Sequence, residues 1–409
     1  MQTHLSPEFA NTPAGQEAEA ILRRCVHCGF CTATCPTYQL LGDELDGPRG
    51  RIYLIKQVLE GEVPTRRTQL HLDRCLTCRN CESTCPSGVE YGHLVDIGRR
   101  IVEEKVPRGA GARALRWALK EGLTSPLFAP AMKLGQAVRP VLPAVLKNKV
   151  PAPQDAGRWP AREHPRKVLL LAGCVQPAMA PNINAATARV LDAAGIQTIV
   201  APEAGCCGAV KFHLNDQEGG LAQMRANVDA WWPWVESSQV EAIVMNASGC
   251  GVTVAEYGHH LQHDALYADK ARRISELTRD LSQMLPGLVS SLRGKVRPPE
   301  GLLAFHPPCS LQHGMKLRGG VERHLGELGF QVRVATAESH LCCGSAGTYS
   351  VLHPKMAGDL RDRKLGVLGE LQPRAIISAN MGCITHLQSG TSLPVRHWVE
   401  VLDSALESA

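Results

Sequence analysis

Short runs of apolar residues recur in the C-terminal part of the chain, and each of them leads into a cysteine. Between the runs lie longer stretches that resemble helices, such as 185–194 and 321–328. An alternation of strands and helices predicts parallel α/β units. In such folds ligands collect at the C-terminal ends of the strands, which is where these cysteines fall. The runs are VLLLAGC at 168–174, AIVMNASGC at 242–250, LLAFHPPC at 302–309 and AIISANMGC at 375–383.

The cysteine spacing divides this part of the chain into two similar halves, which we place at 166–297 and 298–409. In each half a cysteine ends an apolar run, a Cys-Cys-Gly follows, and a Gly-Cys ends a second run. The first interval is 32 residues in one half and 33 in the other, and the second is 43 and 40. Matching order and spacing predict an internal duplication. The eight cysteines are Cys174, Cys206, Cys207, Cys250, Cys309, Cys342, Cys343 and Cys383.

Two interpretations of these eight cysteines remain open. Buried cysteine often serves as a small hydrophobic residue, which explains single cysteines well. It does not explain adjacent pairs that recur in register. The glycine after each pair permits close approach of the backbone to a cofactor. We therefore favour metal or thiol chemistry, with a further iron–sulfur cluster in each half as one form of it.

The N-terminal part of the chain, 1–105, holds the other eight cysteines in two complete motifs. Both fit C-x2-C-x2-C-x3-C-P, the pattern that binds [4Fe–4S] clusters and in which the fourth cysteine ligates the cluster of the other motif. Zinc also uses paired C-x2-C, but it gives no reason for a duplicated Cys-Pro. We therefore predict two [4Fe–4S] clusters in a helical ferredoxin-like domain. The first is held by Cys25, Cys28, Cys31 and Cys85, and the second by Cys75, Cys78, Cys81 and Cys35.

The region between these parts, 106–165, contains no cysteine and is basic and rich in proline. It has ten Lys or Arg against three Asp or Glu, and nine prolines. We expect short helices here that end or kink at Pro126, Pro130, Pro140 and Pro143. A solvated linker is one interpretation. The other is a docking surface for a membrane or an acidic partner.

Composition narrows the class of protein further. Of 409 residues, 44% are hydrophobic, 20% are charged and only 4% are aromatic, and the formal net charge is +5. These values fit a globular protein and give no sign of nucleic-acid binding. The N-terminus lacks the pattern of a signal peptide, and no stretch resembles a transmembrane helix. We therefore expect a reducing compartment, in which cysteine is used for metal rather than for disulfides.

The paired ferredoxin motifs followed by two Cys-Cys-Gly halves resemble a large family that includes heterodisulfide reductase subunits. Within it the chain is similar to the iron–sulfur subunits of bacterial glycolate oxidase (glycolate dehydrogenase). The stretches at 25–61, 75–89, 184–196 and 340–349 carry the likeness, which covers nearly the whole chain. The implied fold is α+β and multidomain, with a mainly helical two-cluster domain followed by two repeated α/β halves.

The resemblance also implies a role. The chain would accept electrons from an FAD-binding subunit that oxidises glycolate to glyoxylate, or a related acid such as D-lactate. It would pass them to the respiratory chain at the cytoplasmic side of the inner membrane. A further flavin subunit and a peripheral contact with the membrane or with quinone would belong to such a complex. No complete G-x-G-x-x-G is present, since Gly249-x-Gly251 continues to Val254, so FAD is expected only on the partner.

One departure from the family pattern concerns the Cys-Cys-Gly halves. Family members that hold a noncubane cluster there end in a second C-x2-C pair. Here Cys250 and Cys383 are each the last cysteine of their half, so a fifth ligand is missing. Two alternatives therefore remain beside electron transfer. One is a heterodisulfide reductase-like reaction at the Cys-Cys-Gly thiols, and the other is a zinc-stabilised adaptor.

Overall fold

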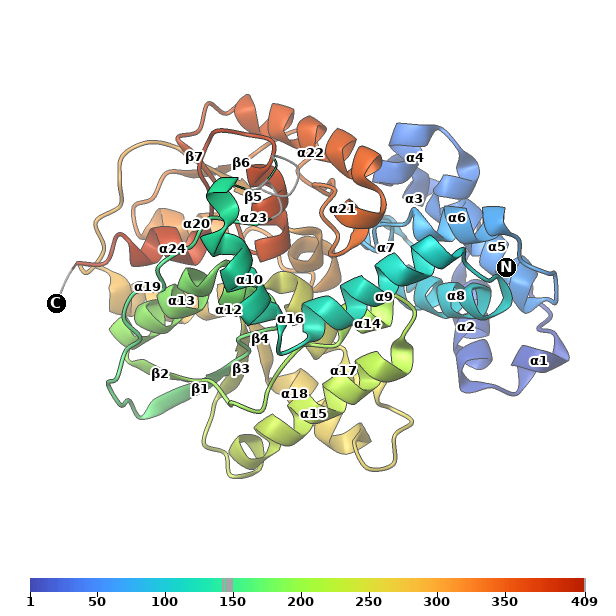
Figure 1. Ribbon diagram of the computed structural model, residues 1–409, viewed down its shortest axis with the longest axis horizontal. Helices are drawn as coiled ribbons and strands as arrows, with labels where there is room; N and C mark the ends of the chain where they lie inside the picture. The colour runs from blue at the N-terminus through green and yellow to red at the C-terminus, as the bar shows by residue number, and fades with distance from the viewer. Residues whose placement is uncertain (142, 144–149, 408–409) are drawn as a thin grey trace.

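The computed structural model describes residues 1–141, 143 and 150–407. The N-terminal helical domain lies at one end of the molecule, and the two α/β halves lie together at the other (Figure 1). Residues 142 and 144–149 of the basic region lie outside the described residues. Within the described part of the chain, no helix has the length and the apolar character needed to cross a membrane.

The N-terminal domain is built from short helices around one apolar core. Each cluster motif follows the same course: the chain leaves a helix, forms the cysteine loop and enters a very short helix. Proline begins several of these helices, at the position where its missing N–H costs nothing. The helices are α1 (Pro7–Ala10), α2 (Pro13–Arg24), α3 (Phe30–Ala33), α4 (Pro36–Leu41), α5 (Pro48–Leu59), α6 (Arg66–Asp73), α7 (Asn80–Thr84) and α8 (Tyr91–Lys105), with a 3-10 turn at Glu44–Asp46.

The described residues of the basic region include two helices that lie on the surface. Helix α9 (Ala110–Thr124) packs against α14 (Ala209–His213), and α10 (Phe128–Ala137) packs against α12 (Gln176–Met179). Helix α9 ends before Pro126, as predicted. Pro130 does not end or kink a helix. It lies in the first turn of α10, where the N–H groups have no intrahelical acceptor. Pro140 lies in a 3-10 turn, Arg139–Val141.

The first half contains a four-stranded sheet in the order β2-β1-β3-β4, and every pairing is parallel. The strands alternate with helices, as the sequence predicts. The strands are β1 (Arg166–Leu170), β2 (Ile196–Ile199), β3 (Ala242–Met245) and β4 (Thr278–Asp280). The remaining helices are α13 (Pro181–Ala193), α15 (Gln217–Glu236), α16 (Ser248–Ala255), α17 (Tyr257–His260), α18 (Ala268–Leu277) and α19 (Leu281–Leu292).

The second half repeats this topology, with parallel strands in the order β6-β5-β7-β8. The predicted α+β fold and the duplication are therefore confirmed. The strands are β5 (Leu303–His306), β6 (Val332–Val334), β7 (Ala375–Ser378) and β8 (Val395–His397). The helices are α20 (Gly320–Glu327), α21 (Tyr349–Leu352), α22 (Pro354–Gly369), α23 (Met381–Gln388) and α24 (Trp398–Asp403), with a π-helical turn at Ser310–Gly314.

The two halves share one hydrophobic core. Helix α13 of the first half packs against α24 of the second, and α20 of the second packs against α19 of the first. The same exchange in both directions indicates an approximate twofold relation. The loops after β3 and β7 meet at this junction, where the Ser248 amide donates to the Ala379 carbonyl at 3.1 Å. The junction therefore brings the start of α16, which contains Cys250, close to the start of α23, which contains Cys383.

Candidate metal centres

Four thiols from both N-terminal motifs surround one hollow at the surface of the helical domain. Cys25, Cys28 and Cys31 come from the first motif and Cys85 from the second, and all four line the hollow. The pKa of Cys31 is raised to about 11. Burial is the largest cause, and the neighbouring thiols of Cys25, Cys28 and Cys85 add to it. Cys28 is exposed, so this set lies at the surface. The structure thus brings together the four residues predicted for the first cluster.

The other four thiols gather on the inner side of the same domain. Burial raises the pKa of Cys81, and so do the neighbouring thiols of Cys78, Cys75 and Cys35. Cys81 also lines the hollow that contains the first set, so the two sets are adjacent. The exchange of the fourth cysteine between motifs is therefore present in the geometry. The ligand assignment itself stays a prediction.

Buried arginines hold the second set in place. The Arg51 guanidinium donates to the His71 carbonyl at 2.7 Å and to Thr37 Oγ1 at 3.1 Å. Arg99 donates to the Cys75 carbonyl at 2.6 Å. The charge of Arg51 lies near the thiols of Cys75 and Cys35. A buried cation near thiols favours their thiolate form, which is the form that ligates iron.

The four cysteines of the first half form a row at the C-terminal ends of β1 and β3. Cys174 lies beside Cys206, Cys206 beside Cys207, and Cys207 beside Cys250. Hydrogen bonds from the two adjoining thiols lower the pKa of Cys206. The glycine after the pair, Gly208, has φ of 93°, and a Cβ there would lie 2.8 Å from the Gly220 carbonyl oxygen. Glycine is therefore required for the turn that presents the pair.

The second half places its cysteines in the same row: Cys309, Cys342, Cys343 and Cys383. All four are buried, whereas Cys174 and Cys250 of the first half are partly exposed. The side chain of Lys364 is also buried, donates to the Glu338 carbonyl, and lies near three of the sulfurs. This half therefore contains a buried positive charge next to its thiols.

The second half also lies directly against the N-terminal domain. Leu76 packs in one apolar cluster with Cys309, Cys342 and Tyr349, and Cys78 packs against that cluster. Burial is the largest cause of the raised pKa of Cys78, and the neighbouring Cys309 thiol raises it further. Polar contacts join the same surfaces, such as Ser83 Oγ to His313 Nδ1 at 2.9 Å and Asn80 Nδ2 to the His340 carbonyl at 3.2 Å. The second cysteine row is thus a neighbour of the predicted second cluster.

The first half contacts the N-terminal domain through charges instead. The Arg79 guanidinium makes a bidentate pair with the Glu256 carboxylate. Beside it the rings of His93 and His259 stack with centroids 3.9 Å apart, and His259 Nε2 lies 3.2 Å from Glu17 Oε1. Sequence analysis missed this group. Arg79 and Glu256 are 177 residues apart in the sequence, so no local pattern joins them.

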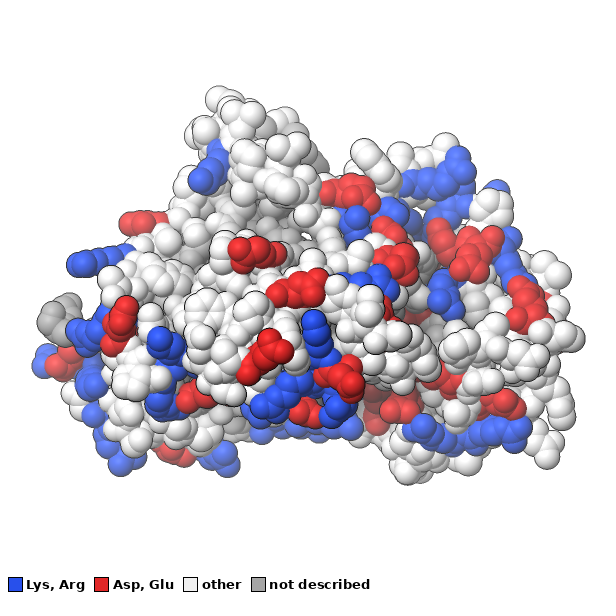
Figure 2. Space-filling view, turned by 90° about the horizontal axis from the view of Figure 1, so that it is seen from below, with Lys and Arg blue, Asp and Glu red and all other residues white. Residues whose placement is uncertain are grey.

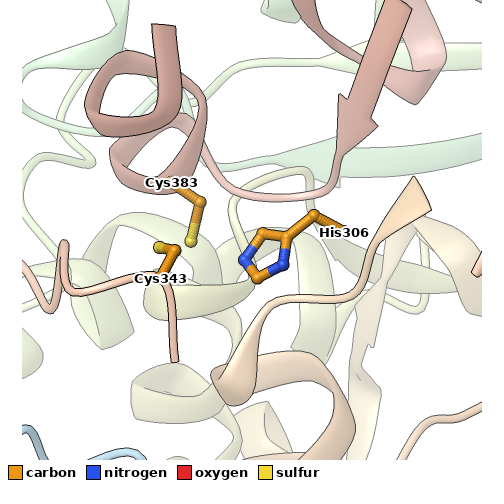
Figure 3. A group of neighbouring side chains, drawn as sticks. All are labelled: His306, Cys343 and Cys383. Carbon is orange, nitrogen blue, oxygen red and sulfur yellow. The ribbon is translucent and has the colours of Figure 1, made fainter. Parts of the chain in front are cut away.

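The histidines near the cysteines differ in whether their ring nitrogens have hydrogen-bond partners. His313 bonds Ser83 and the His340 carbonyl, and His213 Nδ1 lies 3.2 Å from Asp96 Oδ1, so both are ordinary partnered residues. His306 is fully buried beside Cys343 and Cys383 (Figure 3). Trp231 is buried in the core of the first half, and Trp232 and Trp234 pack against that core.

Comparisons with known proteins agree with this architecture. A family model described as a 4Fe-4S dicluster domain matches residues 21–89, and one described as a cysteine-rich domain matches 168–255 and 303–388. The chain is 56% identical to the glycolate oxidase iron-sulfur subunit of Escherichia coli (strain K12), over the full length of both. It is 28% identical to the probable glycolate oxidase iron-sulfur subunit of Bacillus subtilis (strain 168), over 91% of this chain and 89% of that protein.

A more distant relative is lactate utilization protein A of Exiguobacterium sp. It is 22% identical, over 59% of this chain and 99% of that protein. Fold and cysteine pattern define an iron–sulfur protein with a dicluster domain and two cysteine-rich halves. Within that class, the chain belongs to the family of glycolate oxidase iron–sulfur subunits. The resemblance drawn from the sequence is confirmed.

Proposed function

We propose that this chain is the electron-transfer subunit of a complex that oxidises glycolate to glyoxylate. The observation that carries the proposal is the arrangement of eight thiols in two adjacent sets of four, with one cysteine exchanged between the motifs. These residues would hold two [4Fe–4S] clusters. Each cluster, when bound, carries one electron at a time. The names of the two glycolate oxidase relatives support the same role.

The oxidation of the organic acid belongs to a partner subunit that binds FAD. The absence of a complete dinucleotide motif from the sequence supports this division of labour. A second flavin subunit would complete the assembly. D-lactate is the further substrate of interest, since several relatives are named lactate utilization protein A.

An anaerobic purification tests this function. The chain is co-expressed with the proposed flavin subunits, and iron, sulfide and flavin are quantified in the complex. We expect about eight irons in the two cubanes of this chain and an EPR signal of reduced clusters within the turnover time after glycolate is added. Glycolate that reduces the flavin but leaves the clusters oxidised would contradict the proposal.

The surface helices α9 and α10 would attach the complex to the cytoplasmic side of the inner membrane. Neither helix has a buried residue. These helices face the viewer in Figure 1, and on the neighbouring face seen in Figure 2 basic and acidic side chains are mixed. The apolar side chains exposed on the helices themselves favour apolar insertion helped by a few cations. The apolar side chains exposed in this region are Leu115, Trp117, Leu127, Leu134, Val138 and Val141.

Vesicle flotation tests the attachment. The chain should float with vesicles containing phosphatidylglycerol, and the double variant Leu127→Glu/Leu134→Glu should not. Leu266→Glu, at an equally exposed position in the first half, is the matched control and should float as the parent does. Equal flotation of all three proteins would contradict the membrane role. So would a double variant that still floats with the vesicles but no longer binds the partner subunit.

A heterodisulfide reductase-like reaction is the second candidate function. The thiol row of the first half favours it, because Cys206 lies between two thiols and two cysteines of that row are partly exposed. With dithionite supplying the two electrons and water the two protons, the isolated chain would then reduce a disulfide substrate to two thiols, and Cys206→Ser would abolish this activity. Activity that survives this substitution would exclude the site.

A further inference from the structure

The second half contains a fifth potential metal ligand that the cysteine pattern does not reveal. His306 is the last residue of β5, and its ring faces the sulfurs of Cys343 and Cys383 (Figure 3). One ligand atom from each of these three residues lies within 4.8 Å of the others. All three side chains are buried, with His306 at 0% exposure. Three donors thus converge on one point that is closed to solvent.

The imidazole of His306 has no other role in the fold. Neither of its ring nitrogens has a hydrogen-bond partner among the residues that the structure describes. An unsatisfied buried polar group costs about 1–3 kcal/mol. The other buried histidines of this half do not carry that cost at both nitrogens: His313 bonds Ser83 and a carbonyl, and His324 bonds Glu327. Coordination of a metal would use the lone pair of one His306 ring nitrogen, which folding leaves without a partner.

The first half has no counterpart to this histidine. Three residues before Cys309 the sequence has His306, and three residues before Cys174 it has Leu171. Leu171 is buried among the apolar side chains of the first half. Lys364, which lies near three sulfurs of the second row, would offset part of the negative charge of the thiolates there. The duplication has therefore kept the cysteines and changed what surrounds them.

We propose that the second half binds a metal centre in which His306 is a ligand together with Cys343 and Cys383, with the sulfurs of Cys309 and Cys342 adjoining. Mixed imidazole and thiolate donors select iron or zinc among the common biological metals. The histidine takes the place of the fifth cysteine that the sequence lacks. This inference does not depend on which molecule supplies electrons to the chain or accepts them.

Metal stoichiometry in the full chain, purified anaerobically, tests the proposal. Iron, zinc and acid-labile sulfide are quantified per chain in the parent and in His306→Leu. We expect the parent to hold metal beyond the about eight irons of two cubanes. His306→Leu should lose that excess and keep the eight. Sulfide in the excess fraction distinguishes an iron–sulfur cluster from a single iron or zinc ion.

Two further variants make the outcome decisive. His324→Gln changes another buried histidine of the same half and should keep all the metal. His306→Cys restores a soft donor and should retain the excess metal. If the centre is paramagnetic, the nitrogen coupling of the parent in pulsed EPR should vanish in this variant. A parent with only eight irons and no zinc would overturn the proposal, and so would excess metal that His306→Leu retains but Cys343→Ser loses.

The two proposals fail in different ways. Absence of the eight irons while the excess metal still depends on His306 would contradict the predicted clusters and leave this centre intact. If His306→Leu does not fold, judged by circular dichroism, the comparison of His306→Cys with the parent still decides whether a nitrogen ligand is present, by pulsed EPR for a paramagnetic centre and by X-ray absorption at the zinc edge for zinc.

Discussion

The two cysteine-rich halves have the same strand order, the same parallel pairing and the same four-cysteine row, yet their surroundings differ. Among the described residues, the strongest charged neighbours of Cys174, Cys206 and Cys207 are the other thiols of the first row, and two members of that row are partly exposed. The second row is buried, includes His306 and Lys364, and lies against Cys78 of the helical domain. Duplication thus preserved the scaffold that places the sulfurs, while the residues that tune them diverged. We infer that one half is adapted to hold metal near the clusters.

The largest expected effect comes from substituting a cysteine that the two motifs of the N-terminal domain exchange. The loss of metal in this domain is the reference for the effects in the two halves. Cys85→Ser should remove one cubane, or about four irons per chain. Loss of a ligand should exceed the ~10–100-fold loss of affinity that follows removal of an outer-shell partner. Electron transfer from the partner should fall with it. Iron analysis and EPR measure the outcome, and Cys250→Ser in the first half is the control that should keep the eight irons.

A double variant shows whether the motifs truly exchange their fourth ligands. Cys28→Ser and Cys85→Ser belong to different motifs but to the same predicted cluster. The double variant should therefore lose about four irons, as each single variant does. A loss of about eight would mean that each motif binds its own cluster, and the exchange would be wrong.

The next largest expected effect is on stability. It compares the charged contact between the first half and the helical domain with the neutral contact made by the second half. Arg79→Met should destabilise the chain by about 3–5 kcal/mol, because it leaves the Glu256 carboxylate largely buried without its partner. Removing a contact of the second half, as in Asn80→Ala, should cost less, since only neutral hydrogen bonds, to the His340 and Thr34 carbonyls, are lost there. Thermal unfolding of both variants measures the difference.

The effect of Arg79→Met should also depend on pH. Burial raises the pKa of Glu256, but His93, whose Nε2 lies 3.6 Å from Glu256 Oε1, and the bidentate Arg79 outweigh burial and hold this pKa below its usual value of 4.5. The stability that the carboxylate contributes is therefore present above pH 4.5 and is lost as pH falls toward the folded pKa. The gap in unfolding temperature between parent and variant should narrow below pH 4.5. A constant gap down to pH 3 would show that the pair is not the source of the effect.

The contrast between these contacts shows what the sequence could predict. The strand runs, the duplication and the cysteine rows follow from local patterns, because a short apolar run and a Cys-Cys-Gly turn are encoded within a few positions. The role of His306 could not be predicted in this way. One histidine at the end of an apolar strand is ordinary, and only folding brings it to Cys383, 77 positions further on. The Arg79–Glu256 pair and the buried Lys364 are of the same long-range kind.

A smaller effect concerns the lysine that only the second half places beside its sulfurs. Lys364→Met should lower the affinity of that half for metal by about 10–100-fold, because the charge that offsets the thiolates is lost. Lys355→Met, on the same helix α22 but with its side chain 89% exposed, is the matched control. Competition with a chelator, followed by metal analysis, measures both. Equal loss in the two variants, or none in Lys364→Met, would mean that the lysine acts only through its bond to Glu338.

The smallest effect compares the residues that end the last strand of each sheet and cap the helix that follows. In the first half Asp280 Oδ1 accepts from the Ser282 amide at 2.8 Å, and in the second half His397 Nδ1 accepts from the Val399 amide at 3.1 Å. Each is also part of a capping box. Burial raises the pKa of Asp280 to about 6 and lowers the pKa of His397 to about 3. Equivalent positions thus hold an acid and a base, and burial favours the neutral form of each.

These opposite shifts predict opposite responses to acid. Between pH 7 and 5 the folded chain begins to protonate Asp280 while the unfolded chain, with its pKa near 3.8, does so less, so this residue adds stability on acidification. For His397 the unfolded chain, with a pKa near 6.5, takes up the proton that the folded chain refuses, so this residue removes stability. Asp280→Asn should therefore steepen the fall of unfolding temperature from pH 7 to 5, and His397→Asn should flatten it.

The loss of capping itself should be small in both variants, about 1 kcal/mol or less, because asparagine is also a good cap. The change of slope, rather than the unfolding temperature at pH 7, is therefore the quantity to compare. Calorimetry at pH 7, 6 and 5 in the same buffer ions measures it. If both variants shifted the slope in the same direction, burial could not be the common cause, and the two capping positions would have to be treated as unrelated despite their equivalent place in the duplicated fold.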